Sequence, residues 1–335
     1  MNPDKETALV TGATGFVGSH MVDCLLEKGY DVIATDLPGA NINVLPKNVK
    51  FVALDVTDPR TLAPLNGYTI HKVFHIAGLF DYTASWERLH AINCEGTKNL
   101  LEVLKKQKAN IKSIVVWSSG SVYGRTFRKE AVKEVEQPSP INFYEKSKLL
   151  EEQIALKMYM TEGLPVVSVR PPAIYGPRSR YGLAVPVFMI NKGLLRCILG
   201  SGKAIGGYMH VHDVAAAAEF LSCQPKAVGE IFNFADDSKV TIEESIYLVG
   251  SLVGAKIWPI HIPMSVVRAL AFIDQKVSSL LGRRPTLERD LIDYLDRDFW
   301  MDNTKLKGFG YKFKYPTLQD GLPPTIAWYR EQKWI

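Results

Sequence analysis

The chain alternates short apolar runs with longer segments whose apolar residues recur every three or four positions. Runs rich in β-branched and aromatic residues predict strands, and the longer spacing predicts amphipathic helices. The predicted strands are residues 8–10, 32–35, 51–54, 73–76, 114–117, 166–169 and 230–234, and helical spacing is clearest over residues 87–106 and 144–159. This alternation predicts an α/β protein with a doubly wound parallel sheet.

The regular alternation ends at Pro171-Pro172 and returns for one helix and one strand. We therefore predict a first domain made of residues 1–172 and about 208–236. The segments of about 173–207 and 237–301 predict a second, smaller and mostly helical substrate lobe, followed by a closing segment over 302–335. A chain of 335 residues suits this division, because it exceeds the usual size of a single hydrophobic core.

A glycine-rich turn, TGATGFVG at residues 11–18, lies between the first predicted strand and a helical pattern. Gly12 permits a tight turn, Gly15 lets the backbone approach a pyrophosphate, and Gly18 lets the helix pack close to the strand. The amides at the helix start, at Phe16 and Val17, then face the anion. This context predicts a dinucleotide-binding site.

Asp36 ends the second predicted strand, where a carboxylate accepts hydrogen bonds from the hydroxyls of an adenosine ribose. The same carboxylate would repel a 2′-phosphate, and the following LPGA segment contains no Arg or Lys to attract one. The predicted cofactor is therefore NAD rather than NADP.

Tyr144 and Lys148 lie four residues apart on one face of a predicted helix, a spacing that suits acid–base chemistry. An unperturbed phenol has a pKa of about 10, and a neighbouring ammonium lowers that pKa by stabilising the phenolate. Ser119 follows a predicted strand at the sheet edge where ligands bind, so we predict that it orients the reacting oxygen. Ser118 or Ser121 is the predicted cap of the turn.

Composition adds little to this picture but excludes some classes of protein. A net charge of +5 in stretches of mixed sign is too diffuse to indicate nucleic-acid binding. The first six residues lack the apolar core of a secretion signal, which favours a cytoplasmic location. The four cysteines show no paired or metal-type spacing and are predicted to be reduced core residues; they are Cys24, Cys94, Cys197 and Cys223.

The most apolar late stretch, residues 262–282, is interrupted by Arg268, Asp274 and Lys276. No transmembrane segment is therefore predicted. The favoured interpretation is a helix that faces the core, and the alternative is an amphipathic helix in peripheral contact with a membrane.

Further motifs accompany the glycine turn and the tyrosine–lysine pair. They are Asp55-Val56, HIAG at residues 75–78, NCEGT at 93–97, RPPAIYGP at 170–177 and VHD at 211–213. With them the chain resembles, over nearly its whole length, an extended short-chain dehydrogenase/reductase of the NAD-dependent epimerase/dehydratase superfamily, which has a Rossmann fold. The pattern is most similar to the branch of 3β-hydroxysteroid dehydrogenases and dihydroflavonol reductases.

The resemblance implies a role for each matched residue. Tyr144 would be the general acid/base, Lys148 would hold the nicotinamide ribose and lower the pKa of Tyr144, and Ser119 would orient the reacting oxygen. The other implied cofactor contacts are Asp55 and Val56 at the adenine, Ala77 and Gly78 along the cofactor, and Pro172 and Ile174 beside the nicotinamide. The resemblance also implies a homodimer, packed through the helices of residues 87–106 and 144–159.

Three polar positions receive simpler interpretations. Asn93 is expected to support the architecture of the site, and Asp213 to cap the alanine-rich helix that follows it. His210 and His212 have no further cluster of ligands beside them, so they are expected to end a strand and no metal site is predicted.

Departures from the family pattern narrow the substrate. Gly206-Gly207 stands where sugar-nucleotide members carry an arginine that grips the diphosphate, although Arg178, Arg180 or Arg196 would be able to replace it. Gly120-Ser121 stands where dehydratases carry an Asp-Glu pair. Apolar residues within 183–199 and 266–281 would line a hydrophobic pocket or simply pack the lobe.

We therefore predict an NAD-dependent oxidoreductase that interconverts a secondary alcohol and a ketone on a small hydrophobic substrate, sterol-like or a hydroxy-lipid. The alternative is a nucleotide-sugar epimerase with tightly bound NAD. A non-catalytic NAD-binding protein is the third hypothesis. The presence of Ser119, Tyr144 and Lys148 argues against it, because a pure binding protein does not need them.

Overall fold

The computed structural model describes residues 5–124, 130–282 and 292–335. Seven strands form one sheet in the order β3-β2-β1-β4-β5-β6-β11, and every neighbouring pair is parallel. The strands are β1 (Thr7–Thr11), β2 (Asp31–Asp36), β3 (Lys50–Ala53), β4 (Lys72–His75), β5 (Ser113–Trp117), β6 (Val166–Arg170) and β11 (Ile231–Asn233). The predicted doubly wound sheet is confirmed, and each predicted strand ends within one residue of the observed one.

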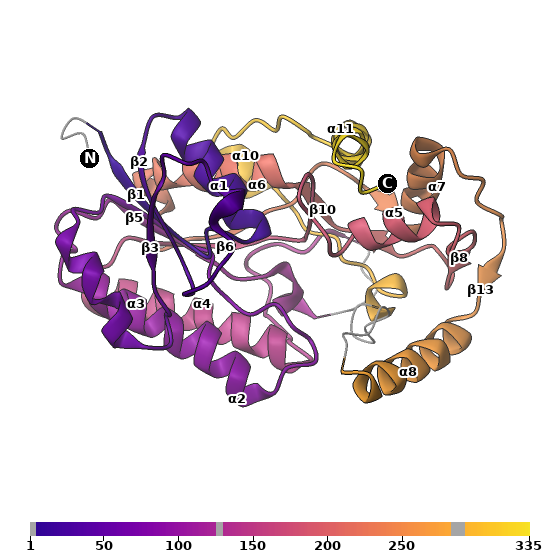
Figure 1. Ribbon diagram of the computed structural model, residues 1–335, viewed down its shortest axis with the longest axis horizontal. Coiled ribbons are helices and arrows are strands. Elements are labelled where there is room, and N and C mark those ends of the chain that lie inside the picture. The colour runs from indigo at the N-terminus through magenta and orange to yellow at the C-terminus, as the bar shows by residue number, and fades with distance from the viewer. Residues whose placement is uncertain (1–4, 125–129, 283–291) are drawn as a thin grey trace.

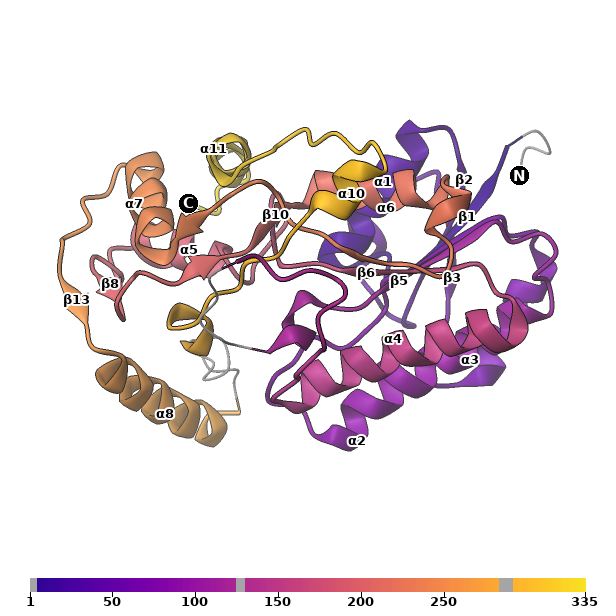
Figure 2. The same ribbon diagram turned by 180° about the vertical axis from the view of Figure 1, so that it is seen from behind.

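Helices cover both faces of this sheet (Figure 1). On one face lie α1 (Phe16–Glu27), α6 (Val211–Ser222) and α10 (Thr304–Gly308). On the other lie α2 (Trp86–Leu89), α3 (Gly96–Lys105) and α4 (Phe143–Glu162), as Figure 2 shows from behind. The helix predicted over 87–106 consists of α2, a π-helical segment over His90–Glu95 and α3.

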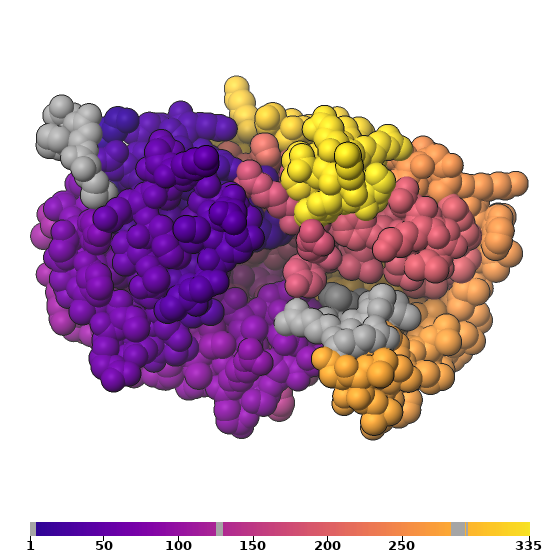
Figure 3. Space-filling view, viewed as in Figure 1, coloured from indigo at the N-terminus to yellow at the C-terminus, as the bar shows by residue number. Residues whose placement is uncertain are grey.

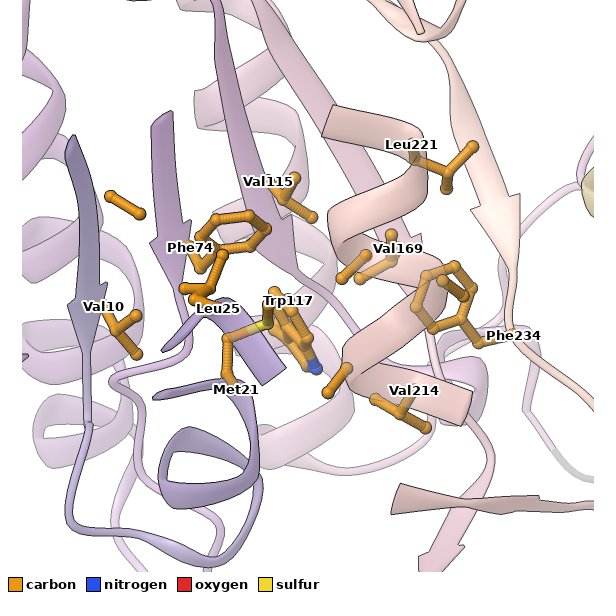
Figure 4. Close-up of a cluster of buried hydrophobic side chains, with 14 of the residues drawn as sticks. Val10, Met21, Leu25, Phe74, Val115, Trp117, Val169, Val214, Leu221 and Phe234 are labelled. Carbon is orange, nitrogen blue, oxygen red and sulfur yellow. The ribbon is translucent and has the colours of Figure 1, made fainter. Parts of the chain in front are cut away.

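Alternate residues of each strand serve the two faces, because successive side chains of a strand point in opposite directions. Ala8 and Val10 belong to the core cluster beneath α1 and α6, and Leu9 belongs to the cluster beneath α3 and α4. Figure 4 shows the first cluster, where Met21 and Leu25 of α1 meet the sheet. Burial on both faces explains why the strands are continuous apolar runs rather than alternating ones.

A third core cluster lies outside the sheet and holds the second lobe together. It contains side chains of α5 (Ala184–Asn191), α7 (Ile242–Val253) and α11 (Leu318–Glu331). The large apolar residues of 183–199 mainly pack the lobe. Five of them are buried in this cluster and three more pack against it; they are Leu183, Val187, Ile190, Leu195 and Ile198, and Phe188, Met189 and Leu199. The closing segment divides its contacts, because Leu306 and Tyr311 belong to the first cluster and Ile326 and Tyr329 to the third.

The helix α8 (Met264–Leu280) differs from its prediction. Its buried side chains are only Val267, Ala271 and Ser278. One face carries exposed apolar side chains at helical spacing, namely Val266, Leu270, Ile273, Val277 and Leu280. The expectation of a core-facing helix is wrong, because only a narrow strip of α8 meets the lobe. No helix within the described ranges is long and apolar enough to cross a bilayer.

The cysteines are free thiols in different surroundings. Cys94 is buried, whereas Cys24 and Cys197 are half-buried. Cys223 is exposed, so its prediction as a core residue is wrong. It follows the last turn of α6, where its Sγ accepts a hydrogen bond from the buried Lys72 (2.9 Å) instead of packing among apolar side chains.

Candidate active site

The glycine turn lies tightly against the end of β4. Gly12 has a φ of +66°, and a Cβ there would lie 2.9 Å from the backbone of Ala77. A Cβ at Gly18 would overlap the carbonyl oxygen of Gly12. Both positions therefore require glycine, and the turn leaves the start of α1 open, since its N-cap residue Gly15 has no side chain.

Asp36 holds this turn in place. Its Oδ2 accepts hydrogen bonds from the Thr14 amide (2.9 Å) and hydroxyl (2.7 Å), and its Oδ1 accepts one from the Leu37 amide (2.8 Å). The residue predicted to bind the ribose thus also orders the loop that faces the pyrophosphate. Sequence reasoning missed this contact with Thr14.

A slot beside Asp36 gathers several of the predicted cofactor residues. It is lined by Thr11, Gly12, Thr35, Asp36, Leu37, Leu54, Val56 and Ala77. Apolar walls that end at a carboxylate fit an adenosine, whose base is flat and whose ribose donates hydrogen bonds. The Asp55 side chain points elsewhere, because its Oδ1 accepts from the amide and hydroxyl of Thr57 (both 2.8 Å).

A larger hollow of about 580 Å³ lies over the start of α1 (Figure 3). Thr14, Gly15 and Phe16 line it from the glycine turn, and Arg180 and Trp334 line it from the second lobe and the C-terminus. Val17 is half-buried and packs against the first core cluster instead. The slot and the open start of α1 fit the adenosine and the pyrophosphate of NAD, whereas the hollow is not lined by Ser119, Tyr144 or Lys148.

The helix α4 begins where Asn142 caps it by accepting a hydrogen bond from the Glu145 amide (2.9 Å). Glu145 is buried and its Oε2 accepts from the Ile141 amide (2.8 Å), so the first turn is fixed at both ends. This turn carries Tyr144. The Ser118 hydroxyl donates to the carbonyl oxygen of Lys148 (3.3 Å), which joins the end of β5 to the same helix.

Ser119 and Tyr144 are brought together as the sequence predicted, close enough for the Ser119 side chain to affect the pKa of the phenol. The Ser121 amide donates to Ser119 Oγ (3.2 Å), so Ser119 itself caps the short helix Gly120–Tyr123. The prediction that Ser118 or Ser121 is the cap is wrong, because the extended backbone of Ser119 precedes the first helical residue. The glycine at position 120 donates its amide to Pro171 (2.8 Å), so the strand leading to Pro172 runs alongside.

Burial raises the pKa of the Tyr144 phenol well above its ordinary value. The Ser119 side chain lowers this pKa, whereas the charge of Glu151 raises it. The expected lowering by Lys148 is thus outweighed. The physical reason is that the Lys148 ammonium donates to Glu151 Oε2 (2.6 Å), and a carboxylate this close cancels most of its field at the phenol.

Lys148 also reaches the residues after β4. A Cβ at Gly78 would lie 3.5 Å from Lys148 Nζ and 3.2 Å from Asn93 Oδ1. Asn93 is buried, accepts from the Leu79 amide (2.6 Å) and donates to Ser147 Oγ (2.9 Å), which gives it the supporting role expected of it. Ala77, Gly78 and Lys148 therefore line one continuous edge of the site.

Aromatic side chains that sequence reasoning missed surround Tyr144. The rings of Phe80 and Tyr82 lie 5.1 and 5.0 Å from the ring of Tyr144, in edge-to-face geometry. Tyr181 from the second lobe lies 6.4 Å from Phe80. Phe80 and Tyr181 are 43% and 52% exposed, so they present apolar surface beside the phenol. The signal for Phe80 and Tyr82 was that they follow the HIAG motif, whereas Tyr181 comes from a distant part of the sequence.

The remaining predicted residues occupy other positions. Ile174 lies in β7 (Ala173–Tyr175) and is half-buried against the first core cluster. His210 ends β10 (Tyr208–His210) and caps α6 by accepting from the His212 amide (3.2 Å), as expected of a strand end. His212 lies in the first turn of α6, so the expectation that it ends a strand is wrong. No group of three His, Cys, Asp or Glu side chains suited to a metal occurs in the described part of the chain.

Asp213 does not cap the helix, and that expectation is wrong. The helix α6 begins at Val211, so Asp213 already lies inside its first turn. Its carboxylate accepts from the Tyr311 hydroxyl (2.8 Å) and from the amides of Lys314 (2.8 Å) and Tyr315 (2.9 Å). Asp213 therefore fastens the closing segment to the first domain.

Comparison with known proteins agrees with this geometry. Residues 8–235 match the family described as "NAD dependent epimerase/dehydratase family". The chain is 28% identical over 344 residues to a UDP-N-acetyl-alpha-D-glucosaminuronate decarboxylase of Bacillus cytotoxicus, covering 98% of both proteins. It is 27% identical over 335 residues to the sterol-4-alpha-carboxylate 3-dehydrogenase, decarboxylating, of Mus musculus, covering 95% of this chain and 89% of that protein.

Solved structures give the same result. A UDP-glucose 4-epimerase of Thermotoga maritima with UDP-glucose has a TM-score of 0.80 at 26% identity, covering 98% of this chain and 99% of that one. A UDP-glucose 4-epimerase of Thermus thermophilus in complex with NAD has a TM-score of 0.77 at 25% identity, covering 97% and 99%. The chain therefore belongs to the NAD-dependent epimerase/dehydratase family, as an NAD-dependent enzyme of the extended short-chain dehydrogenase/reductase type.

Proposed function

We propose that this enzyme interconverts a secondary alcohol and a ketone on a hydrophobic substrate, sterol-like or a hydroxy-lipid. The observation that carries the proposal is the group of aromatic side chains around Tyr144, formed by Phe80, Tyr82 and Tyr181. Apolar rings bind flat or aliphatic molecules through their faces and edges, and they contribute no charge that would hold a phosphate. Similarity to the sterol-4-alpha-carboxylate 3-dehydrogenases adds support.

The proposed roles follow from the positions of the side chains. Bound NAD would accept or return the hydride. Tyr144 would take the hydroxyl proton of the alcohol, or give it back to the ketone. Ser119, which lies beside Tyr144, would hold the same substrate oxygen, and Lys148 would bind the nicotinamide ribose beside Gly78.

The alternative is a nucleotide-sugar epimerase, and one observation favours it. Arg178 and Arg196 each have a buried Nη1 with no hydrogen bond within the described residues, and at Arg196, which forms no ion pair there either, a diphosphate would supply a partner. The two other candidate arginines are already engaged, because Arg178 pairs with Asp23 (2.8 Å) and Arg180 stacks on Trp334 (4.0 Å). Similarity to UDP-glucose 4-epimerases supports the same alternative.

Two assays on the purified protein separate these functions. NADH absorbance is followed with NAD and a panel of hydroxysterols, hydroxy-lipids and their β-carboxylate derivatives, whose oxidation to β-keto acids would release CO2. UDP-sugars are incubated in parallel and analysed for epimers. NADH that accumulates only with the hydrophobic alcohols supports the proposal. An epimer without net NADH contradicts it, and an Arg196→Ala variant should then raise the KM for the UDP-sugar.

We also propose a homodimer that packs through α3 and α4. Phe143, Leu150 and Ile154 lie on one side of α4 and are exposed or half-exposed, which supports an interface there. The molar mass from light scattering tests the dimer, and a Leu150→Glu variant should be monomeric. The exposed apolar face of α8 supports peripheral membrane contact as an additional proposal.

A further inference from the structure

Glu151 is a buried carboxylate next to the catalytic lysine. Its side chain is fully buried, and its Oε2 accepts a hydrogen bond from Lys148 Nζ (2.6 Å). Its Oε1 is buried with no hydrogen-bond partner within the described residues. A buried carboxylate oxygen without a donor disfavours the charged form, so burial raises the pKa of Glu151 to about 7.

Several titratable groups surround Glu151, and among them Glu151 is the group positioned to take up or release a proton. On α4 these are Lys148, Tyr144 and Glu152, and the last is already paired with Arg170 (2.6 Å). Cys94 faces it from the π-helical segment, and burial raises the pKa of that thiol to about 12. Thr97 lies near it on α3, but the Thr97 hydroxyl donates to the carbonyl oxygen of Asn93 (2.6 Å).

The polar chain behind Thr97 is also neutral. Thr11 Oγ1 accepts from the amides of Ile76 and Ala77 (both 3.1 Å), so its hydroxyl proton is directed to His75 Nδ1 (2.8 Å). His75 Nε2 then carries the hydrogen and donates to Thr97 Oγ1 (2.8 Å). Burial lowers the pKa of His75 to about 3, so it stays neutral at physiological pH.

The net charge of the buried side chains indicates what Glu151 does. With a neutral phenol, an ammonium and a carboxylate, the buried group of Tyr144, Lys148 and Glu151 has no net charge. Ionisation of Tyr144 alone would leave a net negative charge in a buried site, which is costly. If Glu151 takes up a proton as Tyr144 loses one, the net charge does not change.

We propose that Glu151 is a positioning residue for Lys148 that also stores the proton released when Tyr144 becomes a phenolate. This inference rests on the proposed function. The O–H bond of Tyr144 breaks and an O–H bond of Glu151 forms, while Lys148 passes the proton on and remains an ammonium. The phenolate then takes the hydroxyl proton of the alcohol, whose hydride goes to NAD. The family motif predicted no role for this position.

The pH profile of kcat/KM for alcohol oxidation tests the proposal. On the acid side of the profile, kcat/KM of the wild-type enzyme should fall as the pH drops below about 7, the pKa of Glu151. This fall is the acid limb of the profile. In Glu151→Gln that limb should move upward by more than about one pH unit, so that activity at neutral pH falls at least about tenfold and recovers at alkaline pH. Glu151→Asp should keep the limb near neutrality. Glu162→Gln, at the exposed end of the same helix, should match the wild type.

A loss of the same size at every pH would mean that Glu151 is only structural and would overturn the proposal. A limb that does not move in Glu151→Gln would also overturn it.

A second measurement needs no substrate and so separates this inference from the proposed function. The ultraviolet absorbance of the Tyr144 phenolate is titrated in the NAD-bound enzyme, using the difference from Tyr144→Phe. Because the charge of Glu151 raises the pKa of Tyr144, most of the phenolate should form at a lower pH in Glu151→Gln than in the wild type. In Glu151→Gln the absorbance titration of the phenolate should therefore shift to lower pH, whereas the fall of kcat/KM on the acid side should shift to higher pH. Identical absorbance titrations in the wild type and Glu151→Gln would refute the coupling between Glu151 and Tyr144.

Discussion

Around α4 the protein buries charged side chains, whereas around α8 it exposes apolar ones. Lys148 and Arg170 are each paired with a buried glutamate at 2.6 Å; the first pair lies within α4, and the second joins α4 to β6. On α8, Leu280 and Leu270 are 88% and 52% exposed. Buried pairs hold side chains in one geometry, because a partner that moves away leaves an unpaired charge. An exposed apolar face does not hold its side chains in one geometry.

The comparison teaches where the chemistry and the specificity of this enzyme reside. The residues proposed to move protons lie on elements fastened to the sheet. The side chains expected to contact substrate come from loops and from the second lobe, such as Phe80 and Tyr181. Related enzymes can therefore keep one reaction centre while their substrates range from UDP-sugars to sterols, as the names of the relatives illustrate.

The largest expected effect is on catalysis. Tyr144→Phe removes the hydroxyl that exchanges a proton with substrate, so kcat should fall by about 10²- to 10⁴-fold. The Kd for NADH, measured by fluorescence, should stay within about twofold. Tyr159→Phe is the matched control, since Tyr159 lies on the same helix and is partly exposed. An active Tyr144→Phe enzyme would refute the proposed role of the phenol.

The next largest effect is expected on stability, when a buried ion pair is broken. Arg170→Met leaves the carboxylate of Glu152 buried without its partner, which should lower the free energy of unfolding by about 3–5 kcal/mol in urea denaturation. Lys105→Met removes a partner of Glu162 in a partly exposed pair, where solvent screens the charges, and should lower the free energy of unfolding far less. Equal losses in both variants would show that burial does not distinguish these pairs.

A smaller effect concerns the cofactor. Asp36→Asn keeps the shape of the side chain but weakens its hydrogen bonds to the ribose and to Thr14, so the Kd for NAD should rise about tenfold. NADP should bind better relative to NAD, because the repulsion of the 2′-phosphate is removed. Calorimetry measures both values, with Asp58→Asn, at a partly exposed aspartate that does not line the slot, as control. An unchanged preference between NAD and NADP would contradict the role assigned to Asp36.

The smallest effect is expected on α8. Leu280→Ser should change the free energy of unfolding by no more than about 0.5 kcal/mol, because the side chain is already in solvent. Ile326→Ala in the third core cluster should cost about 2–5 kcal/mol. Sedimentation with anionic vesicles sharpens the comparison. Binding that Leu280→Ser abolishes would show that the exposed face contacts membranes.

Local pattern predicted the elements of this protein well. The strands are short apolar runs because both faces of the sheet are buried, and the glycine turn is tight because a Cβ at Gly12 would meet Ala77. Such features depend on residues close in sequence or on a repeating geometry. The pairing of Tyr144 with Ser119 was predictable for a related reason, because a motif after β5 and a helix at the same sheet edge must meet.

The failures have a common cause. Cys223 and Asp213 were predicted to be a core residue and a helix cap, yet each binds a partner far away in the chain, and α8 has an apolar face that stays exposed. Asp213 binds residues about a hundred positions later, and Cys223 contacts Lys72. Sequence periodicity contains no information on such partners.

The sequence by itself determined the fold class, the cofactor and the tyrosine–lysine pair, because these follow from spacing along single elements. Only the tertiary structure decided the electrostatics of the site. Lys148 was expected to lower the pKa of Tyr144, yet a buried Glu151 three residues further along binds the ammonium, and burial raises the pKa of the phenol. Charge interactions depend on distance and on exclusion of water, and both are set only when α4 packs against the sheet.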